Sequence, residues 1–153
     1  MINNDVLRSL RFMLDISDAK VAEITGLSGL EISETLVSSC LMKDDEAGFI
    51  PCSDEVLAHF LDGLVIFRRG KDDSRPTPAI ELPITNNMVL KKLRVAFELK
   101  EDDLHDILKA ADFQVSKPEL SALFRKAGHS NYRLCGDQLL RNFLKGLTLR
   151  LRG

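Results

Sequence analysis

The stretch that decides the fold is CSDEVLAHFLDGLVIFRRG, residues 52–70, because it returns as CGDQLLRNFLKGLTLRLRG, residues 135–153. Nine of these 19 positions are identical: Cys, Asp, Leu, Phe, Leu, Gly, Leu, Arg and Gly. Each stretch predicts a long helix that begins just after its cysteine, at Ser53 or Gly136. Outward from these stretches, the similarity covers residues 3–70 and 86–153, so the chain contains an internal duplication.

Both copies open with a helical pattern. Apolar residues recur at the i, i+3, i+4 and i+7 spacing that buries one face of a helix. They are Val6, Leu7, Leu10, Met13 and Leu14 in the first copy and Val89, Leu90, Leu93, Ala96 and Phe97 in the second. Because asparagine is a favoured N-cap, the Asn pairs at 3–4 and 86–87 are predicted to begin these helices.

Two more helices are predicted between these ends of each copy. The second helix covers about residues 17–25 or 101–111. The third begins with a capping box, Ser28-x-x-Glu31 in the first copy and Ser116-x-x-Glu119 in the second. Aligning the two boxes requires five extra residues around positions 110–114.

The patterns together predict an all-α protein of two tandem four-helix units, related by internal duplication and packed on each other. The first unit is residues 1–70 and the second is residues 86–153. Residues 71–85 are interpreted as a linker, because prolines at 76, 78 and 83 break a helix and favour extended chain. A unit of this size is marginal alone, since about 60 residues bury only about 60% of their unfolded surface.

Composition places the chain in the soluble class. Of its 153 residues, 44% are apolar and 29% are charged. No apolar run is long enough to cross a bilayer, and the first residues lack a secretory signal, so we expect a cytoplasmic protein without a membrane partner. Three cysteines in such a chain indicate free thiols.

Charge is divided unevenly between the copies. Residues 1–70 hold 6 Lys and Arg against 12 Asp and Glu, a net charge of −6, whereas residues 86–153 hold 13 against 8, a net charge of +5. The acidic copy can face the basic copy, within one chain or between chains. Alternatively, the basic copy binds an acidic partner such as nucleic acid, or the split is drift on solvated surfaces.

Several segments resemble a known family. They are NNDVLRSLRFMLDISDAK in the first copy, and NNMVLKKLRVAFELKEDD and YRLCGDQLLRNFLKGL in the second. Over essentially the whole chain these segments resemble the YehS-like family of small bacterial proteins, a domain family of unknown function. The resemblance implies a bacterial, cytosolic, duplicated protein. It implies no catalytic residue, cofactor or substrate.

No catalytic, cofactor or metal site is predicted. Structural zinc needs four closely spaced ligands, and the chain has neither a C-x-x-C pair nor two histidines in one helical turn. Cys52 and Cys135 are instead interpreted as small apolar residues at the entry to the fourth helix. His59 lies two helical turns beyond Cys52, and its counterpart is Asn142. We therefore predict that the protein is not an enzyme.

Two charged pairs recur at equivalent positions of the copies. Asp54 and Asp137 lie in the first turn of the fourth helix, where a carboxylate meets free backbone N–H groups. Arg11 and Arg94 are the repeated cations of the first helix. We predict that these residues form structural Asp–Arg ties between the first and fourth helices.

The segment KVAEITGLSGLEISETL, residues 20–36, matches the spacing of a helix-turn-helix, with Gly26 taking the turn. Glu31 and Glu34 replace the side chains that would read bases, and carboxylates repel phosphate. The leading hypothesis is therefore a non-catalytic protein-binding or regulatory module that binds an unknown protein or self-associates. The alternative is nucleic-acid binding through this segment, near residues 17–40, or through a basic surface of the second copy. That surface comprises Lys91, Lys92, Arg125, Lys126, Arg133, Arg141 and Lys145.

Overall fold

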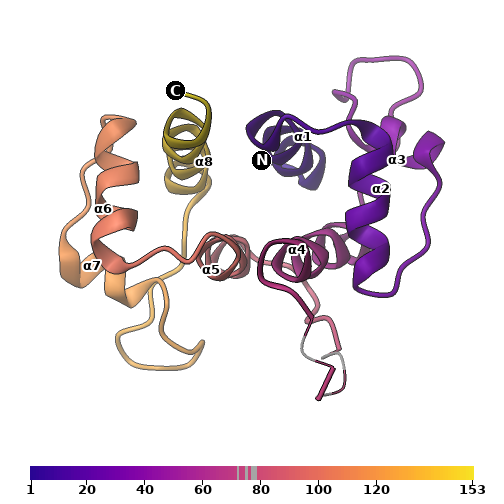
Figure 1. Cartoon of the computed structure of the whole chain (residues 1–153). Coiled ribbons are helices and arrows are strands. Elements are labelled where there is room, and N and C mark those ends of the chain that lie inside the picture. The colour runs from indigo at the N-terminus through magenta and orange to yellow at the C-terminus, as the bar shows by residue number, and fades with distance from the viewer. Residues whose placement is uncertain (72, 75, 77–78) are drawn as a thin grey trace. The chain divides into compact units, whose positions relative to one another are not determined.

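A computed structural model describes residues 1–71, 73–74, 76 and 79–153. The chain divides into two compact units, Met1–Ile84 and Thr85–Gly153. Within the described residues there are eight α-helices and no strand, so the predicted all-α architecture with an internal repeat is confirmed (Figure 1). Part of the predicted linker, including Pro78, lies outside the described residues.

Each unit contains four helices in the same order. The first unit contains α1 (Asn3–Leu14), α2 (Asp18–Leu27), α3 (Glu34–Cys40) and α4 (Asp54–Arg69). The second unit contains α5 (Asn86–Ala96), α6 (Glu101–Ala110), α7 (Lys117–Ala122) and α8 (Asp137–Arg152). Every helix of the second unit begins 83 residues after its counterpart. The prediction that the second copy has an insertion of five residues around positions 110–114 is therefore wrong.

The predicted insertion depended on a cap at Ser28, and the cap of the third helix lies at another serine. Ser33, not Ser28, is the N-cap of α3, and its hydroxyl accepts from the Leu36 N–H at 3.1 Å. Ser28 ends α2, where its hydroxyl donates to the His59 carbonyl oxygen at 2.7 Å. In the second unit Ser116 caps α7 as predicted, accepting from the Glu119 N–H at 3.3 Å.

The predicted helix-turn-helix turn is also wrong in its position. Gly26 lies inside α2, and the left-handed backbone is at Gly29, with φ of 106°. The connection then runs through residue 33 before α3 begins, and α3 is only seven residues long. Gly26 therefore does not make the tight turn that its spacing suggested.

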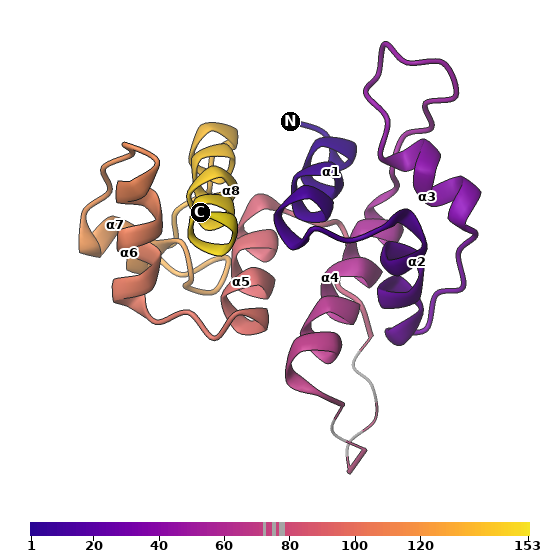
Figure 2. The same cartoon turned by 45° about the horizontal axis from the view of Figure 1, so that its top comes forward.

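The long C-terminal helix of each unit carries a glycine at an equivalent position, and this glycine allows a close contact with another helix. A Cβ atom at Gly63 of α4 would lie 1.9 Å from the Ile24 carbonyl oxygen of α2. One at Gly146 of α8 would lie 2.0 Å from the Ile107 carbonyl oxygen of α6. Figure 2 shows α4 against α2 and α8 beside α6. Only glycine permits backbones this close, which explains its identity in both copies.

The fourth helix of each unit, α4 or α8, contributes a buried apolar face to the core. The phenylalanines at equivalent positions, Phe60 and Phe143, are 0% and 1% exposed. They are surrounded by leucines of the same helices, all of them buried: Leu57, Leu61 and Leu64 in α4, and Leu139, Leu140, Leu144 and Leu147 in α8. No helix among the described residues has the length and apolar character needed to span a bilayer.

Candidate functional site

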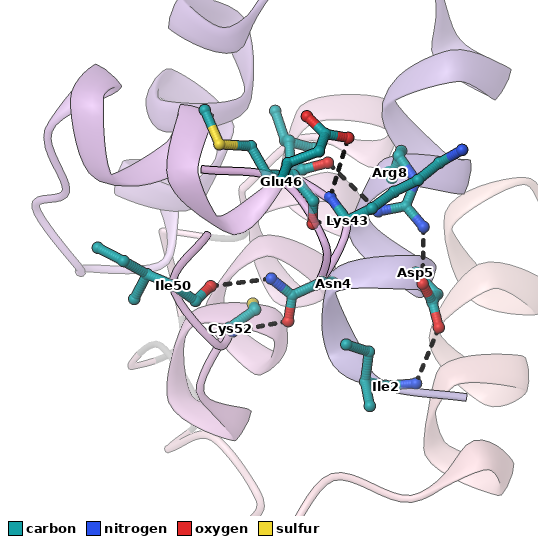
Figure 3. A network of polar contacts seen from close by, with 10 residues as sticks. Ile2, Asn4, Asp5, Arg8, Lys43, Glu46, Ile50 and Cys52 are labelled. Carbon is teal, nitrogen blue, oxygen red and sulfur yellow. Dashed lines mark hydrogen bonds and ion pairs between the residues drawn. The ribbon is translucent and has the colours of Figure 1, made fainter. Parts of the chain in front are cut away.

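A buried asparagine anchors the α3–α4 connection of the first unit (Figure 3). Asn4 lies in the first turn of α1 and is 1% exposed. Its side-chain amide donates to the Ile50 carbonyl oxygen at 2.9 Å and accepts from the Cys52 N–H at 2.8 Å. The connection is thus fixed to α1 at the point where it enters α4, because both backbone groups are satisfied by one side chain.

The second unit repeats this arrangement with Asn87. Its amide donates to the Arg133 carbonyl oxygen at 2.8 Å and accepts from the Cys135 N–H at 2.9 Å. The helices begin at Asn3 and Asn86 as predicted, but neither asparagine is the N-cap. Ile2 precedes α1, and the Thr85 hydroxyl caps α5 by accepting from the Met88 N–H at 3.2 Å.

The other asparagine of each pair meets the predicted aspartate. Asn3 donates to Asp54 Oδ1 at 2.7 Å, and Asn86 donates to Asp137 Oδ1 at 2.8 Å. The hydrogen bond from Asn86 is the main reason that the pKa of Asp137 lies below its usual value. The first and fourth helices of each unit are therefore tied by Asn–Asp contacts.

The predicted ties from Arg11 and Arg94 to these aspartates are wrong. Arg11 Nε lies 2.9 Å from Asp18 Oδ1, so it pairs with the first turn of α2. Arg94 donates from Nε to the Leu99 carbonyl oxygen at 3.2 Å, and its guanidinium stacks on the Phe124 ring. Each arginine projects from the last turn of its helix and is therefore closer to the next helix than to the start of the fourth.

The anchored connections carry opposite charge. Residues 42–50, MKDDEAGFI, have one Lys against three Asp and Glu, and the equivalent residues 125–133, RKAGHSNYR, have three Lys and Arg and no Asp or Glu. Nearly all of these residues are exposed. Figure 1 shows both connections extending away from the helices of their units. These equivalent surface loops account for 5 of the 11 charge units by which the two copies differ.

The predicted basic residues lie on three elements of the second unit: Lys91 and Lys92 on α5, Arg125, Lys126 and Arg133 on the α7–α8 connection, and Arg141 and Lys145 on α8. Within the part of the chain that the structure describes, Lys91, Arg125, Lys126, Arg141 and Lys145 make no side-chain hydrogen bond or ion pair. All five are exposed. Arg133 differs, because it forms an ion pair with Glu119 of α7.

The cysteines lie in surroundings that suppress thiolate formation. Burial raises the pKa of the Cys52 thiol to about 12 and that of the Cys135 thiol to about 11. Burial also raises the pKa of Cys40. Because the thiolate is the nucleophile and the metal ligand, these environments disfavour both roles.

His59 has a partner that the sequence did not reveal. Its Nδ1 lies 2.8 Å from Ser28 Oγ, and that hydroxyl also reaches the His59 carbonyl oxygen. The Ser28 proton therefore has a backbone acceptor, so the pair serves to hold the end of α2 on α4. Among the residues that the structure describes, no three or more His, Cys, Asp or Glu side chains form a group suited to a metal.

The helix-turn-helix-like segment borders an open groove of about 600 Å³ along α2. Small residues Ala19, Ala22 and Gly26 line it, together with the carboxylates of Glu23 and Glu31. An acidic wall repels nucleic-acid phosphates. This groove therefore gives no support to DNA binding by residues 17–40.

Known proteins resemble this chain in sequence, but their descriptions give no activity. The family model described as "Protein of unknown function (DUF1456)" matches residues 3–70 and again residues 86–153. "Uncharacterized protein YehS" of Escherichia coli (strain K12) is 47% identical over 150 residues, covering 98% of this chain and 96% of that protein. No solved structure matches.

Proposed function

Because the chain belongs to the family described as "Protein of unknown function (DUF1456)", we propose a function from its surface chemistry: a non-catalytic binding or regulatory module that holds an acidic protein surface on its second unit. The supporting observation is the set of five exposed cations without a hydrogen bond or ion pair to described residues, namely Lys91, Arg125, Lys126, Arg141 and Lys145. Exposed cations that form no internal ion pair favour an external acidic partner. Of the five, Arg141 lies close enough to Asp137 to lower the pKa of that carboxyl.

A protein partner fits this surface better than nucleic acid. Single strands bind through aromatic side chains on which bases stack. Tyr132 is partly buried, and the Phe124 ring is already covered by Arg94 at 4.7 Å. Double-stranded DNA is usually read by one helix in the major groove, whereas the five cations are divided among α5, the α7–α8 connection and α8.

The first unit lacks a cation at the positions equivalent to three of these five residues. At positions equivalent to Arg125, Arg141 and Lys145 it carries Met42, Ala58 and Asp62. An acidic partner would therefore be attracted by one unit and repelled by the other. Such opposite potentials select orientation and partner more than they raise affinity.

The experiment measures binding of a fluorescent Glu-rich peptide to the full chain across a salt series. The variant Arg125→Met/Arg141→Ala/Lys145→Asp carries the first unit's own residues, which this fold accommodates. We expect about a tenfold weaker affinity and a shallower salt dependence, because exposed ion pairs contribute up to about 1 kcal/mol each.

The matched control is Asp44→Ala/Glu46→His, which replaces acidic residues of the first unit by their second-unit equivalents. Peptide binding in this control should equal or exceed that of the original chain. Tighter binding to single-stranded DNA of equal charge than to the peptide would contradict a protein partner and favour the nucleic-acid alternative. If the triple substitution left peptide binding unchanged, these cations would not form the binding surface.

A further inference from the structure

We propose that the second unit contains a binding site for a small oxyanion, a carboxylate or phosphate group, in a hollow beside Arg94 and Arg125. This inference goes beyond the proposed protein partner, because it concerns a small ligand and an arginine outside the five-cation set. The hollow has a volume of about 290 Å³. Its lining residues are Arg94, Glu101, Leu120, Ser121, Phe124 and Arg125.

Arg94 is held in place before any ligand arrives. Its Nε donates to the Leu99 carbonyl oxygen at 3.2 Å, and its guanidinium carbon lies 4.7 Å from the centre of the Phe124 ring. These two contacts leave the terminal nitrogens without a hydrogen bond to the residues that the structure describes. A planar guanidinium fixed in this way presents paired N–H donors, which match the two oxygens of a carboxylate or phosphate.

The first unit shows what the equivalent arginine does when an acid is supplied internally. There Asp18 lies 2.9 Å from Arg11, and its other oxygen accepts from Ser38 at 2.6 Å. The second-unit equivalent of Asp18 is Glu101, which accepts from Ser121 at 3.2 Å but makes no ion pair with Arg94 within the described residues. Arg94 therefore lacks the carboxylate that neutralises Arg11.

A second cation appears at the same hollow only in the second unit. Arg125 replaces Met42, and it makes no hydrogen bond or ion pair to described residues. Two arginines against the one carboxylate of Glu101 leave a local charge of about +1, which suits a monoanionic group. The volume lies near the lower end of the ligand-site range of about 300–1,000 Å³, so the ligand is small.

The test is a titration of the full-length, ¹⁵N-labelled protein with acetate and, separately, with inorganic phosphate. Sodium chloride at equal ionic strength is the reference. We expect saturable shifts of the Arg94 Nε–H signal and of the Ser121 and Arg125 amides, at concentrations of about 1–10 mM. The anion that saturates at lower concentration identifies the carboxylate or the phosphate as the ligand group. The Arg11 signals should not move, because Asp18 already occupies that guanidinium.

Two variants separate the site from general electrostatics. Arg125→Met carries the first-unit residue, and Arg94→Lys keeps the charge but removes the planar pair of donors. Each should weaken anion binding about tenfold, and thermal unfolding should show that both variants remain folded. Lys145→Asp, which lies outside the hollow, should weaken Glu-rich peptide binding and leave acetate and phosphate binding unchanged, which distinguishes this site from the proposed protein surface. Shifts that chloride reproduces, or that persist unchanged in both variants, would overturn the proposal.

Discussion

At equivalent positions the two units make different surface interactions, but they share a buried asparagine anchor and a buried glycine contact. On α2 and α4, the Lys20 ammonium lies 4.8 Å from the centre of the Phe67 ring. At the equivalent positions of α6 and α8, Asp103 pairs with Arg150 at 2.6 Å. A cation on an aromatic ring has been exchanged for an ion pair, so this exposed helix contact can be made by more than one chemistry.

The buried asparagine and glycine contacts show no such exchange. The amide of Asn4 and that of Asn87 bond the same two backbone groups of their connections, and Gly63 and Gly146 meet equivalent carbonyl oxygens. An unpaired buried N–H is costly, and a Cβ has no room between touching backbones. These buried positions thus maintain the fold, whereas the exposed helix contact differs between the units.

The largest expected effect is that of Gly63→Ala. The new Cβ would lie 1.9 Å from the Ile24 carbonyl oxygen, so α2 and α4 must separate. We expect the free energy of unfolding of the first unit to fall by more than about 3 kcal/mol, at the upper end of overpacking costs. Urea unfolding measures this. Gly26→Ala is the control, because its Cβ meets nothing within 4 Å and alanine favours a helix by about 0.5–1 kcal/mol.

Gly146→Ala should reproduce the effect in the second unit, where the clash is with Ile107. A stable Gly146→Ala variant beside an unstable Gly63→Ala variant would show that the two helix crossings are not equivalent.

The next largest effect is expected for Asn4→Ala. It leaves the Cys52 N–H and the Ile50 carbonyl oxygen without their partner, at about 1–3 kcal/mol. Hydrogen exchange should show faster exchange of the Cys52 amide, with urea unfolding giving the energy. Asn87→Ala should act in the same way on Cys135. Normal protection of the Cys52 amide in Asn4→Ala would contradict the anchoring role.

The repeated sequence was sufficient to predict the all-α duplicated architecture, because identity at spaced apolar positions reports a shared buried face. The position of the third helix in the first copy was not predictable in this way. Ser28-x-x-Glu31 has the composition of a capping box, and only the folded chain, in which Ser28 bonds to His59, shows that it ends a helix instead. Local capping patterns are therefore weaker evidence than a constant repeat spacing.

The partners of individual side chains also could not be predicted from the sequence. The Asp54 and Arg11 identities suggested one tie, but the chain instead uses two different ties, Asn3 with Asp54 and Arg11 with Asp18. Identity between copies shows that a position is constrained without showing which group it meets. The hollow beside Arg94 is formed by residues from four segments, which only the folded chain brings together.

A smaller effect tests the exchange between Lys20–Phe67 and Asp103–Arg150. Lys20→Asp should cost about 1 kcal/mol in the first unit, since it removes the ring contact and places a carboxylate near Glu23. The double variant Lys20→Asp/Phe67→Arg should recover to within about 0.5 kcal/mol of the original chain. A double-mutant cycle by urea unfolding measures the coupling. Strict additivity of the two substitutions would mean that the first unit does not accommodate the second unit's ion pair.

The smallest effect is a pH dependence that only the second unit should show at this position. The backbone N–H of Lys100, followed by Arg150, lowers the pKa of Asp103 below its usual value of 3.8. A carboxyl whose folded pKa is depressed stabilises the fold above the unfolded pKa and loses this contribution as the pH falls through the folded value. The stability difference between the original chain and Asp103→Asn should therefore be present at pH 7 and shrink below pH 3.8. Phe67→Leu in the first unit is the matched control, because it removes the ring contact of Lys20 without removing a charge, so its stability difference should not follow the same trend. Equal pH trends for both substitutions would show that the ion pair contributes nothing specific to the second unit.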